Sequence, residues 1–180
     1  MDNLKPIFNV GNLVYEVARQ NPEIQAIRDK GNILTYKDLN YYALLIASFL
    51  LEQGAVNNTI GILGERNITS LTGVLGSIYA GCSYTPLNTN YPQEKVNKII
   101  KEAEISYIIC QYKDLAKYHD VFKKNNVVIL MPSDETILVD KGLFFRKEIE
   151  KVHPLLLHPK NVCKETNAYI LYTSGTTGNP

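Results

Sequence analysis

A cluster of hydroxyl side chains and glycines near the end of the sequence is the stretch best suited to chemistry. Its residues are Thr173, Ser174, Gly175, Thr176, Thr177 and Gly178. Glycines let successive backbone N–H groups converge on one point, and such a convergence binds anions. The hydroxyls can donate further hydrogen bonds to phosphate oxygens. The pattern indicates a phosphate-binding loop, and a polar turn between strands is the alternative that composition alone allows.

The residues before this cluster favour phosphate binding over a plain turn. Ala168 to Tyr172 form a short apolar run, which predicts a buried strand that carries the hydroxyl cluster at its carboxyl end. In open α/β sheets, ligands bind at that edge. Two other nucleotide signatures are missing, because Gly175 is not followed by the Lys-Ser or Lys-Thr of a Walker loop and no Gly-x-Gly occurs. The Gly-x-Ser-x-Gly of a serine hydrolase is also missing.

Helices and strands alternate along the rest of the sequence. Asn21-Pro22 ends the first helix, because the residue before a proline disfavours helical geometry. Thr35 and Asp38 have the spacing of a capping box, and we assign them to helix capping ahead of any catalytic role. In chain order, the predicted elements are a helix at 13–20, strands at 26–29 and 33–35 around a turn at 30–32, a helix ending at 54, a strand at 59–64, a helix at 69–80, a strand at 82–87, a helix at 93–104, a strand at 106–110, a helix at 115–124, a strand at 127–131, a strand or hairpin at 139–145 and the strand at 168–172.

This alternation predicts an α/β fold of the doubly wound type. Buried strands separated by helices need right-handed crossovers, and these give a mostly parallel sheet with helices on both faces. With 180 residues, 45% of them hydrophobic, the chain is long enough to bury one substantial core. We therefore expect one domain, or one domain with an appendage.

Charge and cysteine usage exclude several classes of protein. The net charge of +1 gives no strong field for nucleic acid or an anionic membrane, so neither is an expected partner. Cys82, Cys110 and Cys163 are widely spaced without a CxxC pair, which is typical of a reduced cytosolic protein. The sequence starts without a signal-peptide pattern, and its most apolar stretch, at 41–51, is too short to span a bilayer. A cytoplasmic location is predicted.

Three smaller groups of polar residues have structural explanations. His153, His158 and Cys163 lie in an irregular passage without a second pair of zinc ligands, so no metal site is expected. Glu65 and Arg66 follow a predicted strand and form either a surface ion pair or part of a site, with the ion pair preferred. The lysines between 95 and 124 alternate with acidic residues, which is typical of a solvated helix surface.

The hydroxyl cluster resembles a known family signature. Residues 168–180, AYILYTSGTTGNP, are similar to the phosphate-binding motif of the adenylate-forming superfamily (ANL, AMP-binding), which usually continues with Lys-Gly. Residues 34–40, 65–67 and 79–96 resemble three further motifs of that superfamily in order and spacing, so the resemblance covers about residue 8 to the end. The stretch at 79–96 is most similar to the amino-acid-activating domains of nonribosomal peptide synthetases, although Tyr79, Asn88 and Lys95 replace the usual lysine, aspartate and arginine.

The resemblance implies an ATP-dependent ligase. A carboxylate, most typically of an amino acid, would attack the α-phosphorus of ATP, pyrophosphate would leave, and the acyl-adenylate would pass to the phosphopantetheine thiol of a carrier protein. ATP and Mg²⁺ are the implied cofactors, and the hydroxyl cluster at 173–178 is the implied phosphate-binding site.

The same resemblance implies that other parts of the enzyme are needed. Residues 1–180 correspond to the N-terminal subdomain of an adenylation domain, cut inside the phosphate loop, and the remaining subdomains, which supply the catalytic lysine, are partners. No catalytic residue is therefore assigned, and this stretch alone is expected to be inactive. The rival hypothesis is a non-catalytic, doubly wound module that binds phosphate or a protein.

Overall fold

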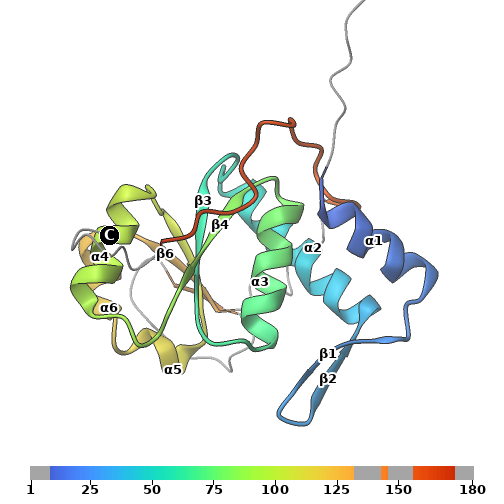
Figure 1. Cartoon of the computed structure of the whole chain (residues 1–180), viewed down its shortest axis with the longest axis horizontal. Coiled ribbons are helices and arrows are strands. Elements are labelled where there is room, and N and C mark those ends of the chain that lie inside the picture. Colours follow the sequence, from blue (N-terminus) through green and yellow to red (C-terminus); the bar gives the residue numbers. More distant parts are fainter. Residues whose placement is uncertain (1–8, 132–142, 146–155, 173–180) are drawn as a thin grey trace, which may run out of the picture.

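The fold is built around a five-stranded parallel sheet, in which the strand order is β4-β3-β5-β6-β7 (Figure 1). The computed structural model describes residues 9–131, 143–145 and 156–172. The strands of this sheet are β3 (Thr59–Leu63), β4 (Ser83–Leu87), β5 (Tyr107–Ile109), β6 (Val128–Met131) and β7 (Leu143–Phe145). All four neighbouring pairs are parallel. The predicted parallel sheet is confirmed, and the segment predicted as a strand or hairpin at 139–145 contributes β7.

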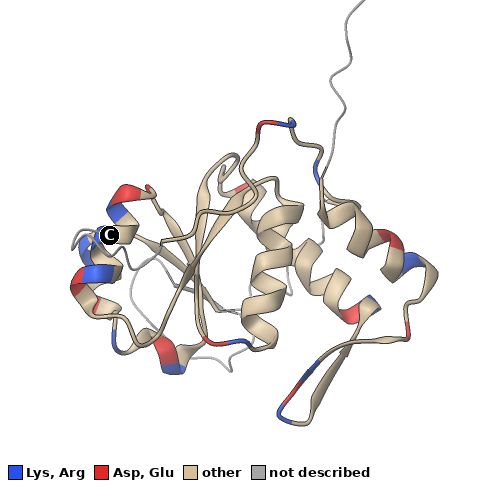
Figure 2. Ribbon diagram, in the orientation of Figure 1, with Lys and Arg blue, Asp and Glu red and all other residues tan. Residues whose placement is uncertain are grey.

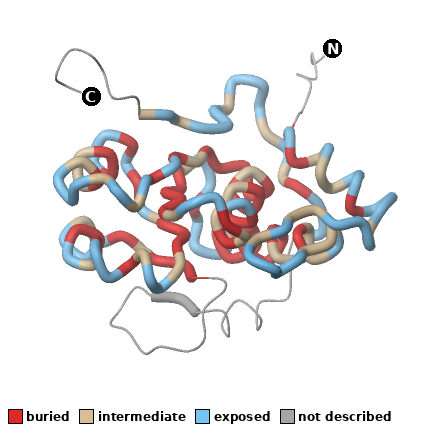
Figure 3. Tube along the Cα trace, turned by 60° about the horizontal axis from the view of Figure 1, so that its bottom comes forward, coloured by how far each residue is buried: buried red, intermediate tan, exposed pale blue. Residues whose placement is uncertain are grey.

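Helices cover both faces of the sheet, as the doubly wound prediction requires. Helices α2 (Tyr36–Glu52) and α3 (Ile68–Tyr79) lie on one side, and α4 (Gln93–Glu102) and α6 (His119–Lys124) lie on the other (Figure 1). Each side has its own cluster of buried apolar side chains. Buried residues lie mainly toward the middle of the described trace, and exposed residues lie mainly toward its outside (Figure 3).

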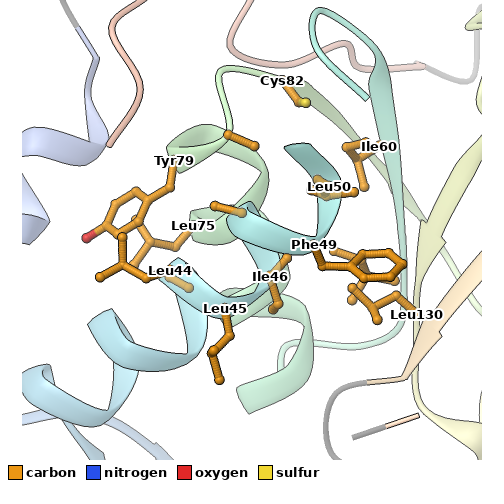
Figure 4. Close-up of a cluster of buried hydrophobic side chains, with 14 of the residues drawn as sticks. Leu44, Leu45, Ile46, Phe49, Leu50, Ile60, Leu75, Tyr79, Cys82 and Leu130 are labelled. Atoms are coloured by element: carbon orange, nitrogen blue, oxygen red, sulfur yellow. The ribbon is translucent and has the colours of Figure 1, made fainter. Parts of the chain in front are cut away.

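The α2–α3 pair is packed closely enough to need a glycine at the contact. A Cβ atom on Gly76 of α3 would lie 2.6 Å from Cγ2 of Ile46 on α2. Nine residues of α2 are buried, namely Leu39 and residues 43–50. The sequence predicted only a single apolar stripe along this helix. Figure 4 shows Leu45, Ile46, Phe49 and Leu50 of α2 in this cluster with residues of α3 and the sheet. A helix that is apolar on most sides is a buried helix.

The N-terminal elements follow the local signals in the sequence. Helix α1 (Gly11–Gln20) stops before Pro22, and β1 (Gln25–Asp29) pairs antiparallel with β2 (Asn32–Thr35). Gly31 has a φ of 91° in the hairpin turn, a conformation that glycine adopts without strain. The Thr35 hydroxyl accepts from the Asp38 N–H over 3.2 Å, and the Asp38 carboxylate accepts from the Thr35 N–H over 3.1 Å. The predicted capping box is confirmed.

The predicted helix at 115–124 is wrong in one respect, because two short helices take its place. They are α5 (Tyr112–Leu115) and α6, and the break between them contains Tyr118. The Tyr118 side chain is fully buried, and its hydroxyl lies 2.7 Å from the carbonyl oxygen of Thr89. This contact joins residues 29 positions apart, so the pattern of apolar residues between 112 and 124 does not predict it.

The predicted buried strand at 168–172 is also wrong. Only Tyr169 forms a bridge, which is parallel and pairs it with Tyr84 of β4. Tyr169 is 55% exposed and Leu171 is 61% exposed. The segment lies on the outer side of β4, at the edge of the sheet. Its apolar residues predicted an interior strand, but the segment occupies an exposed edge position.

Charged residues are sparse on the α2–α3 pair, where they occur only near the two ends of α2 (Figure 2). Helix α3 carries none, whereas α4 and α6 show both signs on their outer surfaces (Figure 2). Lys98 and Glu102 of α4 lie 3.8 Å apart, and both side chains are more than one third exposed. The predicted solvated helix surface between 95 and 124 is confirmed.

Candidate functional site

The carboxyl ends of β3, β4 and β5 meet at one edge of the sheet. β4 lies on one side of β3 and β5 on the other, so consecutive connections leave this edge toward opposite faces. In open α/β sheets such a reversal creates a crevice in which ligands bind. Three loops meet there, at 64–67 after β3, at 88–92 after β4 and at 110–111 after β5. We take this edge as the candidate site.

The loop after β3 is tied to the loop after β5. Asn67 caps α3, because its side-chain oxygen accepts a hydrogen bond from the Ser70 N–H over 2.9 Å. Its amide nitrogen donates to the side-chain oxygen of Gln111 over 3.3 Å. A Cβ atom on Gly64 would lie 2.7 Å from the Ser70 hydroxyl oxygen, so the turn into α3 leaves no room for a side chain there. Sequence reasoning missed this pair, because its members are 44 residues apart.

Glu65 and Arg66 lie in the same loop, at its junction with α3. Within the described part of the chain, no ion pair joins them or involves either of them, so the preferred prediction of a surface ion pair is wrong. Both residues are exposed in the bend that joins β3 to α3.

The loop after β4 is held by its own turn and by the segment between α5 and α6. The Asn88 side-chain oxygen accepts from the Asn90 N–H over 2.8 Å, and the Tyr91 N–H donates to the Asn88 carbonyl over 3.0 Å. Lys117 donates from Nζ to the Thr89 carbonyl over 2.7 Å. The carbonyls of this loop also surround the Tyr118 hydroxyl. Sequence reasoning missed Tyr118, because a single tyrosine among the polar and apolar residues of a predicted helix does not indicate a contact with a distant loop.

Residues 168–172 run along β4 toward the same edge. The Tyr84 N–H donates to the Ala168 carbonyl over 3.2 Å, and the Ile170 N–H donates to the Tyr84 carbonyl over 2.9 Å. The Thr85 hydroxyl adds a bond to the Ile170 carbonyl over 3.1 Å. Because the bridge is parallel, the segment leaves the sheet at the carboxyl end of β4.

The predicted phosphate-binding residues follow directly on this segment but lie outside the described residues. They are Thr173, Ser174, Gly175, Thr176, Thr177 and Gly178. What the structure describes is the stem that leads to them, from Ala168 to Tyr172. Burial raises the pKa of the Tyr172 hydroxyl, and the charge of Glu102 raises it further. Tyr172 is therefore a neutral hydroxyl at physiological pH.

Of the three cysteines, Cys110 lies in the loop after β5 at this edge, and Cys82 lies at the opposite end of the sheet, just before β4. Cys82 and Cys110 are buried and Cys163 is exposed, and no disulfide joins them, as predicted. Burial raises the pKa of the Cys82 thiol to about 11, and its Sγ donates to the Ala55 carbonyl over 2.8 Å. At neutral pH this thiol is not a nucleophile, because the thiolate is the reactive form.

Two absences concern metals and membranes. In residues 9–131, 143–145 and 156–172, no group of three or more His, Cys, Asp or Glu side chains is arranged to hold a metal ion. Over the same ranges, every helix is too short or too polar to cross a bilayer.

A cavity of about 410 Å³ lies at the opposite edge of the sheet. Ile78, Gly81 and Cys82, just before β4, form part of its wall with Val162 and Ala168. The cavity is thus separated from the loops of the candidate site by the length of β4.

Comparison with known proteins decides the family. A family model described as "AMP-binding enzyme" matches residues 14–180. The chain belongs to this AMP-binding family. The resemblance inferred from four motifs in the sequence is thereby confirmed.

Several curated relatives are peptide synthetases. Gramicidin S synthase 2 of Brevibacillus brevis is 28% identical over 93% of this chain, which spans 3% of that protein. Tyrocidine synthase 1 of Brevibacillus parabrevis is 29% identical over 96% of this chain, which spans 14% of it. Syringomycin synthase SyrB1 of Pseudomonas syringae is 29% identical over 98% of this chain, which spans 26% of it. The AMP-binding chain thus covers a small part of each relative.

Solved structures share the fold. A red-emitting luciferase from Phrixothrix hirtus superposes with a TM-score of 0.80 at 20% identity, over 99% of this chain and 46% of the luciferase. A nonribosomal peptide synthetase, FmoA3, superposes with a TM-score of 0.72 at 20% identity, over 94% of this chain and 16% of that protein. The α/β fold of the AMP-binding chain is therefore the one found in these proteins.

Proposed function

We propose that the chain is the N-terminal part of an adenylation domain that activates an amino acid. The reaction joins the amino-acid carboxylate to the α-phosphate of MgATP and releases pyrophosphate. The family match and the similarity to peptide synthetases support this assignment. Residues 1–180 are proposed to form one subdomain, whose active site is completed by the remaining subdomains of the same domain.

The proposed role of the hydroxyl cluster is to bind the β- and γ-phosphates of MgATP. Charge builds up on the departing pyrophosphate during the reaction, and fixed N–H and O–H donors stabilise such charge. The residues are Thr173, Ser174, Gly175, Thr176, Thr177 and Gly178. In this proposal Mg²⁺ arrives with ATP, as its counterion. No residue of this chain is given a role in bond making or breaking.

The observation that carries the proposal is the path of residues 168–172. Three hydrogen bonds hold this segment against Tyr84 and Thr85 of β4 and point it at the carboxyl edge. There the loops after β3 and β5 are joined by the Asn67–Gln111 hydrogen bond. A glycine- and hydroxyl-rich loop that follows a segment leaving at the carboxyl edge of a parallel sheet has the position expected of a nucleotide-phosphate site.

The test is amino-acid-dependent exchange of pyrophosphate into ATP by the longest reading frame that contains this sequence. We expect exchange with one or a few of the twenty common amino acids, and transfer of the activated acid to a carrier-protein phosphopantetheine thiol. The 180-residue chain alone is expected to show none, because positioning of both reactants requires the other subdomains. Phosphate or protein binding by the long frame without exchange would favour the rival, a non-catalytic module.

A further inference from the structure

The Tyr118 hydroxyl lies among three carbonyl oxygens of the loop after β4. Its distances are 2.7 Å to Thr89, 2.7 Å to Tyr91 and 3.4 Å to Asn88. A phenol has one hydrogen and so donates to one carbonyl at a time. The Tyr118 side chain is fully buried. Its hydroxyl is thus a buried donor that holds the backbone of residues 88–91 in place.

Two neighbouring bonds strengthen the same connection. Lys117 Nζ donates to the Thr89 carbonyl over 2.7 Å, and the Gln93 side-chain amide donates to the Lys117 carbonyl over 2.6 Å. Both of these bonds are exposed, so water can replace them at little cost. The Tyr118 side chain is fully buried, so water does not readily replace its hydroxyl. It is therefore the member of this network whose loss matters most.

The loop held by Tyr118 begins at the carboxyl end of β4, and the stem of the candidate phosphate site leaves the sheet at the same end of this strand. Tyr84 is paired with Tyr169 in a parallel bridge. Parallel strands advance one residue for one residue, so Tyr172 corresponds to Leu87, the last residue of β4. Asn88 begins the held loop at the next position along β4.

A shared core connects the two segments. Tyr91 of the loop and Tyr172 of the stem both pack against the cluster that contains Leu87, Tyr118 and Phe122. The rings of Tyr118 and Phe122 stack with centroids 5.9 Å apart. A shift of the loop would therefore disturb the cluster against which Tyr172 packs.

We propose that Tyr118 is a positioning residue for nucleotide binding. It fixes the loop at 88–91, and through the shared core it fixes the exit of the stem at Tyr172. The expected effect on nucleotide binding rests on the proposed function. The expected effect on the loop and the stem rests on the described geometry alone.

The test compares Tyr118→Phe with Tyr107→Phe in the longest reading frame that contains this sequence. The Tyr107 hydroxyl also donates to a backbone carbonyl, that of Gln53 over 2.9 Å, but at the first residue of β5 and so at the opposite edge of the sheet. Each variant loses one hydroxyl and keeps its ring. Tyr107→Phe therefore shows the effect of removing a tyrosine hydroxyl from an exposed hydrogen bond far from the loop at 88–91.

The first measurement is hydrogen–deuterium exchange of the backbone. We expect Tyr118→Phe to speed exchange about three- to tenfold in peptides covering 88–92 and also 168–172, with Tyr107→Phe unchanged there. Faster exchange at 88–92 alone would overturn the proposal, because the stem would then be independent of Tyr118. This measurement needs no enzymatic activity, so it decides the structural claim even if the proposed function fails.

The second measurement is pyrophosphate exchange at varied ATP. We expect Tyr118→Phe to raise KM for ATP about three- to tenfold, with kcat and the KM for the amino acid changed less than about twofold. A purely structural role would lower the amount of active enzyme and therefore kcat, with KM for ATP unchanged. That result would also overturn the proposal.

Discussion

Asn67 and Gln111 join the loops after β3 and β5 through their side chains, with the Asn67 amide nitrogen 3.3 Å from the Gln111 amide oxygen. The same Asn67 side chain caps α3 through its oxygen, which accepts from the Ser70 N–H. One amide group therefore sets both the start of a helix and the spacing of two loops at the reversal of strand order. Since Asn67 is 7% exposed, neither bond is easily replaced by water.

We expect Asn67→Ala to destabilise the protein by about 1–3 kcal/mol, because a helix cap and a cross-loop hydrogen bond are both lost. Asn67→Ser keeps a capping oxygen and loses only the bond to Gln111, so about 0.5–1.5 kcal/mol is expected. Gln111→Ala should match the serine variant. Urea unfolding monitored by circular dichroism measures all three. Equal losses in Asn67→Ala and Asn67→Ser would show that the cap contributes nothing.

The hydroxyl cluster can be tested by removing one hydroxyl at a time in a protein extended through the rest of the domain. We expect Thr176→Ala and Thr177→Ala each to cost about 1–3 kcal/mol in ATP binding, as for a hydrogen bond to a charged group. Stability should change by less than about 0.5 kcal/mol, because little apolar area is involved. Melting temperature is compared with the ATP-dependent rate.

A plain turn at this position predicts the opposite pattern. The two threonine variants would keep their full rate, and Gly175→Ala would act through the melting temperature by disfavouring positive φ. Unchanged rates in both threonine variants would therefore defeat the assignment of a phosphate loop.

Gly76 offers a test of the α2–α3 contact. Glycine to alanine inside a helix usually stabilises it by up to about 1 kcal/mol. Here the new methyl group would meet Ile46 at 2.6 Å and the Ala43 carbonyl at 3.2 Å, so we expect a net loss of about 1–3 kcal/mol. Gly73→Ala serves as the comparison, because its nearest contact is a side-chain methyl of Ile109 at 3.0 Å. A higher denaturant midpoint for Gly76→Ala would contradict this expectation. It would show that α2 and α3 move apart to admit the methyl group at no net cost in stability.

The buried thiol of Cys82 predicts a pH dependence. Its pKa in the folded protein is about 11, raised from 9.0 mainly by burial. Its contribution to stability is therefore complete below pH 9 and is lost as the pH rises toward 11, at a slope of up to about 1.4 kcal/mol per pH unit. Burial, and then Tyr15, also raises the pKa of Tyr79, whose ordinary value is 10.0. Tyr84 and Tyr172 also have raised pKa values, so the thiol is isolated by the difference in slope between the original protein and Cys82→Ala, which should be flatter between about pH 9 and 10.

Local signals in the sequence were enough for most of the fold. The capping box at Thr35 and the hairpin turn at Gly31 depend on residues three or four apart, and both formed as predicted. The β3 run is apolar at most positions, and it forms an interior strand with all five residues buried. These features were predictable because their causes lie within one element.

The remaining features depend on contacts between distant residues. The break at Tyr118 depends on carbonyls 27 to 30 positions away. The exposure of Tyr169 depends on the order of strands, which the apolar run does not encode. At the candidate site, the sequence pointed to the hydroxyl cluster but gave no sign of the Asn67–Gln111 pair. A single sequence records which residues are present, and pairing across such distances follows only from topology.

The exposed stem on the outer side of β4 has a consequence for handling the purified polypeptide. Tyr169 and Leu171 present apolar side chains beside a strand-like backbone, and such edges pair with other chains. We expect the 180-residue polypeptide to self-associate as its concentration rises, which light scattering would show as a growing average mass. Leu171→Lys would add a charge at that edge and should keep the polypeptide monomeric at concentrations where the original sequence forms larger particles.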